Sequence, residues 1–302
     1  MVNFNNEEYQ ILVSDLIGDI YYTSTSYRSK ISRLRQYAEV VVRKLFDIPP
    51  DQKISLGNTT IRKCISELQH HEYVNNAVEI IKTNGNNCTH TACRDEVTSK
   101  DFEDTANALI NLLSYFFIDY FEKYDFGSNG SVMHVFSILP PIIRYTILQF
   151  LYEEYPDNIF IIDKLVLATL KAHNVEKAIT WIEENKESLL QMNVYSEDFY
   201  AQIAQQDSNV AEVSKAIAPP NMYQLCKDKI YHVGREIHSY GLLYSDFESA
   251  IPFYRQAGRL QGTTPEILEF NDIMDFLYMG HKSRERLYSE LNTSEAVIDK
   301  IE

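Results

Sequence analysis

The strongest constraint on the fold is a run of apolar residues spaced by three and four positions in the first quarter of the chain. Over residues 27–45 these positions are Tyr27, Ile31, Leu34, Ala38, Val41 and Leu45. This spacing places them on one face of an α-helix, which turns once every 3.6 residues or so. Similar spacing recurs along the chain, and no run of alternating β-branched residues bounded by turns interrupts it. The sequence therefore predicts an all-α protein.

Further helices are predicted on both sides of this segment. In the N-terminal part they cover about residues 6–22, 59–68, 72–83 and 99–124. Thr98 and Asp101 have the capping-box spacing at the start of the last of these helices. Short connections between consecutive helices predict an antiparallel bundle, which Pro49 and Pro50 interrupt after the periodic helix.

A second domain is predicted because 302 residues exceed what one compact helical core usually holds. Residues 127–131 are small and polar, without an apolar anchor, which is typical of a linker. We therefore predict an N-terminal helical bundle over residues 1–126 and a multi-helix domain of unassigned type over residues 132–302.

Turn and capping residues locate the helices of this second domain. Helices are predicted to open at Pro141, Ser196 and Thr264, and Ser245 with Glu248 has the spacing of another capping box. Two predicted helical stretches also look like tetratricopeptide helices, over residues 167–179 and 246–257. Their separation is not a multiple of the usual period of about 34 residues, so ordinary helical packing explains them at least as well.

The charge distribution bounds the class of partner. A formal net charge of -15 opposes indiscriminate binding to nucleic acid or anionic membranes. Residues 26–47 are the exception, with six cations against two anions. The first eight residues have neither the basic region nor the apolar core of a signal peptide, and no run is long enough to span a bilayer. The spacing of the four cysteines suits no disulfide framework, so we expect a cytoplasmic protein without a membrane role.

One short polar stretch carries the candidate chemistry. Gly85 lies among three asparagines, and His90 follows five residues later. A glycine with neighbouring asparagines is typical of a helix end, so one interpretation is a simple corner between helices after Thr83. The other interpretation considers the surrounding helices. Arg35 and Glu39 lie in the periodic helix upstream, and a long aromatic helix follows downstream.

Arranged in this order, the residues over positions 7–125 resemble the HEPN superfamily. More narrowly, they are similar to an uncharacterised HEPN-like family found with bacterial restriction and phage-defence systems, whose signature is Arg-x-x-Gly-Asn-x-x-x-His. The resemblance implies a homodimer in which an arginine and a histidine meet across the interface, with no metal or cofactor. It also implies a role in prokaryotic defence or stress response, acting on or sensing RNA or nucleotides.

Carried onto this chain, the resemblance assigns a role to each residue of the cluster. His90 takes the histidine role, Lys82 occupies the arginine position and Asn86 is the polar residue between them. Arg35 and Glu39 would be supporting charges. In catalytic members of the superfamily the histidine exchanges a proton with the ribose 2′-hydroxyl or the leaving oxygen, while the arginine stabilises charge on the phosphate.

Two departures from the signature leave alternatives open. Lysine lacks the bidentate fork of arginine, and seven residues separate Lys82 from His90, where catalytic members usually have a shorter spacing. Arg94 stands four residues after His90 and is a second source of a guanidinium group. The chain is therefore either a non-catalytic HEPN-like module that binds or senses RNA, nucleotide or a partner protein, or a metal-independent endoribonuclease that uses His90. A third alternative is a helical adaptor in which His90 is structural.

Each alternative makes a different demand on the structure. A ribonuclease should present its basic second helix to the substrate, whereas an adaptor should offer its C-terminal helices to a protein partner. Zinc-type ligands also lie near His90, namely Cys88 and Cys93, with His70 and His71 upstream. Their spacing is not that of paired zinc ligands, so no metal site is predicted.

Overall fold

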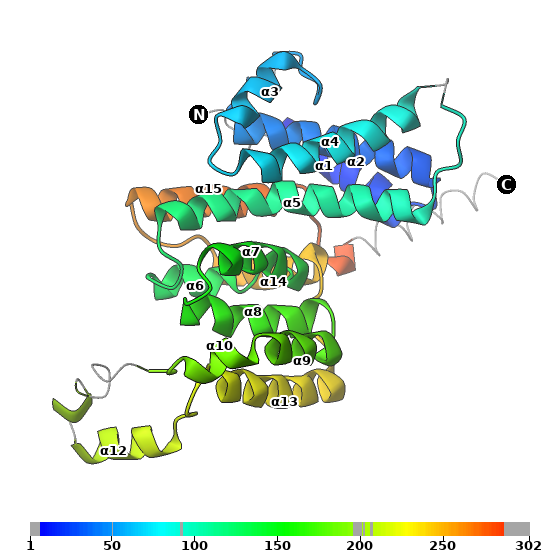
Figure 1. The fold of residues 1–302 in the computed structure, drawn as a ribbon. Coiled ribbons are helices and arrows are strands. Elements are labelled where there is room, and N and C mark those ends of the chain that lie inside the picture. Colours follow the sequence, from blue (N-terminus) through cyan, green and yellow to red (C-terminus); the bar gives the residue numbers. More distant parts are fainter. Residues whose placement is uncertain are drawn as a thin grey trace. The chain divides into compact units, whose positions relative to one another are not determined.

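The computed structural model describes residues 7–286, except residues 50, 91–92, 196–200, 202 and 206–207 and the side chains of residues 208–211. All regular secondary structure in these residues is helical (Figure 1), which confirms the all-α prediction. Among the described helices, none is both long and apolar enough to cross a membrane. The predicted helix at Ser196 begins outside the described residues.

The chain packs as two compact units that are discontinuous in sequence. The first unit takes residues 1–125, 130–138 and 246–302, and the second takes residues 126–129 and 139–245. These units do not coincide with the predicted division at residues 127–131. Aromatic packing explains the difference, because Phe270 and Phe276 lie 5.6 Å and 5.3 Å from Phe117 and Phe116, measured between ring centroids. Residues far along the chain thus complete the core of the N-terminal bundle.

The first unit contains the candidate site. Its elements are α1 (Glu7–Ile17), η1 (Gly18–Tyr22), α2 (Tyr27–Leu45), α3 (Thr59–Ser66), α4 (His71–Thr89), α5 (Ser99–Lys123), α6 (Gly130–Phe136), α14 (Phe247–Ala257) and α15 (Pro265–Leu277). Helices α2, α4 and α5 pack against one another, α1 lies against α2 and α15 lies against α5. Figure 1 shows α15 running beside α5.

The second unit is also entirely helical in its described part. It contains α7 (Pro141–Glu154), α8 (Ile159–Ala172), α9 (Val175–Glu184), α10 (Lys186–Gln191), α12 (Ser208–Ile217) and α13 (Met222–Tyr240). Helix α8 packs against α7, α9 and α13. The single tryptophan, Trp181, lies in α9 and therefore reports on this unit alone.

Local signals in the sequence place helices α2 and α5 correctly. Helix α2 begins after Ser26, whose side chain accepts a hydrogen bond from Ser29 N–H (3.3 Å), and most of its predicted apolar stripe is buried. Helix α5 begins at the predicted capping box, where Thr98 and Asp101 each bind the other's backbone. Both helices keep their predicted boundaries because their ends are specified by residues within the same turn.

Other helix starts shift by a residue or two. Helix α3 is capped by Asn58, whose side chain accepts a hydrogen bond from Thr60 N–H (2.8 Å). Asp246 caps α14 and forms a capping box with Ser249, so the predicted box starting at Ser245 is displaced by one residue. Glu248 therefore does not have the predicted capping role. It is buried in the first unit, where it is 5% exposed.

Candidate functional site

Helix α4 runs through the stretch that was predicted to be a corner. It continues to Thr89, so the predicted end near Thr83 is wrong, and His90 is the C-cap residue. Gly85 is buried, and a Cβ atom at this position would lie 2.6 Å from Arg35 Cδ and 3.0 Å from Arg35 Cβ. The absence of a side chain at Gly85 therefore allows α2 and α4 to approach closely. Glycine is as suitable for such a contact as it is for a helix end.

The continuous helix aligns three of the predicted residues. Lys82, Asn86 and His90 are four positions apart, a spacing that places side chains on one face of a helix. Arg35 of α2 donates a hydrogen bond to Asn86 Oδ1 (2.5 Å) and lies 3.6 Å from Glu39 Oε1. The structure thus brings together Arg35, Glu39 and Asn86 at the contact between α2 and α4.

These contacts give most of the predicted site residues a structural role. The side chains of Arg35 and Glu39 are only 19% and 27% exposed. Burial raises the pKa of Glu39 above its ordinary value, and the charges of Arg35 and Arg43 offset only part of that effect. Lys82 forms an ion pair with Glu79 of its own helix. None of these side chains turns a charge outward for a ligand.

His90 and Arg94 are the exceptions. Both are exposed, and neither side chain forms a hydrogen bond or an ion pair among the described residues, although the His90 backbone N–H donates to the Asn86 carbonyl (3.1 Å). Arg28 holds the connection that carries them, because its guanidinium donates to the backbone carbonyls of Asn87 (2.7 Å) and Asp95 (2.8 Å). The last turn of α4 and the segment that precedes α5 are therefore both tied to α2 through one side chain.

The remaining cations of α2 are also engaged within the first unit. Arg33 pairs with Asp19 (2.9 Å), Arg43 donates to the carbonyls of Pro49 and Gln52 (2.8 Å and 2.7 Å), and Lys44 pairs with Asp272 (2.6 Å). Lys30 lies over the ring of Phe102 at 5.8 Å from the centroid. The basic second helix therefore uses its charge to hold neighbouring elements of the first unit.

The zinc-type ligands near His90 do not form a metal site in the part of the chain described here. Among those residues, no three or more histidine, cysteine, aspartate or glutamate side chains gather closely enough to hold a metal ion. His70 instead lies 3.4 Å from Glu122. Burial raises the pKa of the Cys88 thiol, and Cys93 Sγ is 3.7 Å from Asn87 Oδ1. Both thiols line the small cavity beside Arg28, of about 140 Å³.

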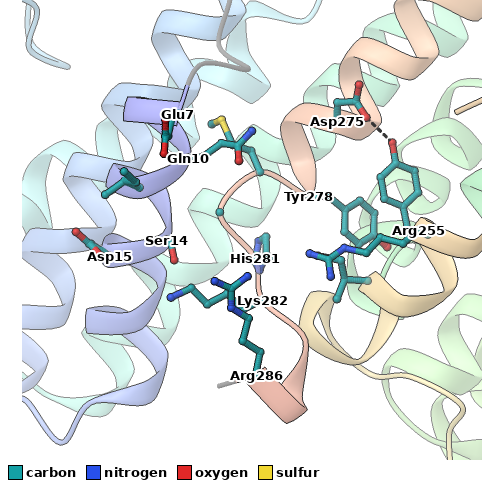
Figure 2. A pocket seen from close by; sticks show the side chains of 15 residues that line it. Glu7, Gln10, Ser14, Asp15, Arg255, Asp275, Tyr278, His281, Lys282 and Arg286 are labelled. Carbon is teal, nitrogen blue, oxygen red and sulfur yellow. Dashed lines mark hydrogen bonds between the residues drawn. The ribbon is translucent and has the colours of Figure 1, made fainter. Parts of the chain in front are cut away.

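A second polar cluster escaped sequence reasoning altogether. His281 Nδ1 lies 2.6 Å from Glu248 Oε1, and both side chains are 6% exposed. Tyr22 also donates its hydroxyl to Glu248. Burial acts to raise the pKa of Glu248, but the hydrogen bond and charge of His281 outweigh it, so the pKa lies below its ordinary value. Figure 2 shows His281 in the wall of a cavity.

Two unusual backbone features position this cluster. Tyr22 ends η1, a π-helix that continues α1, and such turns are rare and frequently occur at functional sites. Gly280, which precedes His281, has a φ of +78°, and a Cβ there would lie 2.6 Å from Ser14 N. The only local sequence signal for this cluster is a glycine followed by a histidine just after a predicted helix. Nothing local in the sequence links it to Glu248, 33 positions earlier.

Comparison with known proteins adds no assignment to these two clusters. No protein-family model matches the chain, and searches of curated proteins and of solved structures found no match either. The HEPN resemblance therefore stays a hypothesis, and the function is argued from the geometry of the side chains.

The close approach at Gly85 predicts a measurable cost for the smallest substitution. Gly85→Ala is expected to lower the free energy of unfolding by about 1 kcal/mol or more, because overpacking against Arg35 outweighs the helix propensity gained. Gly57→Ala is the matched control, since its new Cβ would meet only Lys82 Cδ at an ordinary 3.7 Å. Urea unfolding followed by circular dichroism compares the two. Equal stability of both variants would contradict the proposed packing role.

Proposed function

We propose that the first unit is a HEPN-like module that binds single-stranded RNA at the C-terminal end of α4. One observation carries the proposal. Of the six candidate residues, only His90 and Arg94 are exposed with side chains that have no hydrogen-bond or ion-pair partner among the described residues. Guanidinium and imidazole groups suit phosphate and base contacts in single strands, whose backbone and bases are both accessible.

Arg28 contributes to this surface indirectly. The aligned peptide dipoles place partial negative charge at the C-terminal end of a helix, which disfavours phosphate there. Arg28 binds the Asn87 carbonyl at this end and supplies a positive charge. Asp95 and Glu96 directly follow Arg94, so the favourable potential is confined to a few atoms. The geometry thus supports local, modest binding of one or two phosphates.

Binding is better supported than catalysis within one chain. A histidine that acts as a general base is usually oriented by a third group, and His90 has no such partner among the described residues. The alternative, a metal-independent endoribonuclease, would need a second copy of the chain to bring its own cation to His90. A homodimer and a role in prokaryotic defence or stress response rest on the resemblance. A protein partner for the C-terminal domain stays a hypothesis.

The test is binding of a fluorescently labelled single-stranded RNA, measured by anisotropy in EDTA at low salt. Arg94→Gln is expected to raise the Kd about tenfold, the usual effect of losing one charge-assisted contact. His90→Ala should raise it several-fold. The logarithm of the affinity should fall with the logarithm of salt concentration with a slope of only about -0.7 to -1.4, since each phosphate neutralised in a single strand contributes about -0.7.

Two exposed residues of the same types serve as matched controls. Arg62→Gln on α3 and His71→Ala at the start of α4 should leave RNA binding unchanged. Equal binding by Arg94→Gln and the wild type would exclude this surface as the RNA site. The same RNA should be checked for cleavage, because 2′,3′-cyclic phosphate ends that disappear in a folded His90→Ala variant would establish the ribonuclease alternative.

A further inference from the structure

We propose that the groove between α9 and α13 binds an amphipathic helix of a partner protein, one with an apolar face and acidic residues at both ends of that face. The groove has a volume of about 520 Å³, and all of its lining residues belong to the second unit. Helix α9 packs against α13, and Figure 1 shows the two helices side by side. This surface is therefore independent of the RNA surface proposed in the first unit.

The two helices of the groove run antiparallel. Near the start of α9, a Cβ atom added to Gly234 would lie 3.3 Å from Val175 Cγ2. Near the end of α9, the Tyr223 hydroxyl donates a hydrogen bond to Glu183 Oε1 (2.6 Å). Between these two contacts the helices lie side by side for about two turns, or about 12 Å. Two helices in contact along such a length form a groove into which the side chains of a third helix can pack.

The middle of the groove is apolar. Ile182 and Ile230 are buried in it, while Val175, Ile179 and Tyr231 are 43%, 45% and 60% exposed. Single exposed apolar side chains are common on protein surfaces, but several along one groove indicate an interaction site. On α9 the three apolar side chains recur at positions i, i+4 and i+7. This spacing is typical of a helix face that packs against another helix.

Both ends of the groove carry a positive charge. Lys227 and Arg235 are exposed on α13 and stand eight positions apart, or about 12 Å along the helix. Neither forms an ion pair among the described residues. Lys227 lies 5.8 Å from the ring centroid of Tyr223, and Arg235 lies 5.5 Å from that of Tyr231. Both charges are therefore available to carboxylates of a partner that are about two turns apart.

Carboxylates of this chain do not neutralise the two cations. Glu183, the one carboxylate in the described lining, is already bound by the Tyr223 hydroxyl and by Lys186 (3.2 Å), and these contacts lower its pKa. On α13, Asp228 accepts a hydrogen bond within its own helix (2.7 Å), and Glu236 lines a different cavity. An apolar surface with positive ends complements a helix with acidic ends and repels a basic one.

The probe for this proposal is a labelled synthetic peptide of about 16 residues, long enough to cover the groove as a helix. Leucines occupy one face of this peptide, and glutamates stand at both ends of that face. Binding to the full chain is measured by fluorescence anisotropy. The peptide should bind about tenfold or more tightly than one with lysines in place of the glutamates, and than a scrambled peptide of the same composition.

Substitutions in the groove separate its apolar and charged parts. Ile179→Asp should weaken binding of the glutamate peptide about tenfold or more. Leu190→Asp on α10 is the matched control, because Leu190 is 47% exposed but lies outside the groove lining, and it should bind like the wild type. The double variant Lys227→Glu with Arg235→Glu should prefer the lysine peptide. Unfolding cannot produce such a reversal.

Three results would overturn the proposal. The first is equal binding of the glutamate and scrambled peptides, or unchanged binding in a folded Ile179→Asp variant. The second is a dimer in sedimentation that Ile179→Asp converts to a monomer while no peptide binds, which would assign the groove to a second copy of the chain. The third is loss of single-stranded RNA binding in the Lys227→Glu, Arg235→Glu variant without an effect on the peptides. Arg94→Gln should bind the glutamate peptide normally, so failure of this proposal is distinguishable from failure of the RNA proposal.

Discussion

Gly280→Ala is expected to destabilise the first unit by about 2–4 kcal/mol, the sum of a left-handed backbone penalty and an overpacking cost. The φ of +78° disfavours any side chain, and the new Cβ would meet the Ser14 backbone N at 2.6 Å and Val13 Cγ1 at 2.8 Å. The backbone of α1 cannot move away from the new Cβ atom as easily as the end of a flexible side chain can. Relief of the clash would have to move His281 or α1, so the cavity should be lost with the stability.

Gly258→Ala is the matched control for this prediction. Its φ of +70° imposes the same left-handed strain, but nothing lies within 4 Å of the added Cβ. The control should therefore cost only about 1 kcal/mol. Hydrogen exchange of peptides from α1 and α15 measures the stability of the first unit. Trp181 fluorescence should show an unchanged unfolding transition for the second unit. If both variants lose the same stability, the contact with α1 contributes nothing.

Removal of His281 is the second large effect. His281→Ala leaves the Glu248 carboxylate buried without its charged partner, with only the Tyr22 hydroxyl and the Glu248 backbone N–H as donors, and breaking a buried pair in this way usually costs about 3–5 kcal/mol. Glu248→Gln should cost less, because a neutral histidine can remain in the site. Tyr22→Phe, which removes one hydrogen bond to a charged group, should cost about 1.5–3 kcal/mol. Urea unfolding of the first unit ranks the three variants, and an equal cost for all of them would contradict the pairing.

The same pair predicts how stability changes with acid. The pKa of Glu248 is lower in the folded protein than its ordinary value of 4.5. The ionised carboxylate therefore contributes stability that is fully present above about pH 4.5 and is lost as the pH falls through the folded pKa. Glu248→Gln should remove this part of the acid sensitivity. An unfolding free energy that falls equally steeply below pH 4.5 in this variant would show that other carboxylates dominate.

Local signals account for what could be predicted from the sequence. The periodicity of α2 and the capping box of α5 are specified by residues within a few positions of each other, so both helices were predictable. The HEPN resemblance led to Arg35, Glu39 and Asn86, which the structure places in contact. The contacts of these three residues hold helices together, however. They differ from His90 and Arg94 in that their side chains are less exposed to solvent.

Contacts between residues that are distant in the sequence account for the features that could not be predicted. Gly85 has the local signature of a helix end, but its neighbour in space is Arg35, and that contact depends on how α2 packs. Glu248 has the spacing of a capping residue, yet its partners are His281 and Tyr22 from other elements. The composition of residues 127–131 is typical of a linker, but it carries no information about the later return of α15 to α5.

The discontinuous first unit has a consequence for synthesis on the ribosome. Phe117 is fully buried in the finished protein, partly by Phe270 of α15. At the usual 5–20 residues per second, α15 is translated about eight to thirty seconds after α5. During that interval the second unit is completed, while the aromatic face of α5 has no cover from α15. The nascent chain therefore passes through a stage in which this face is open to chaperones or to neighbouring chains.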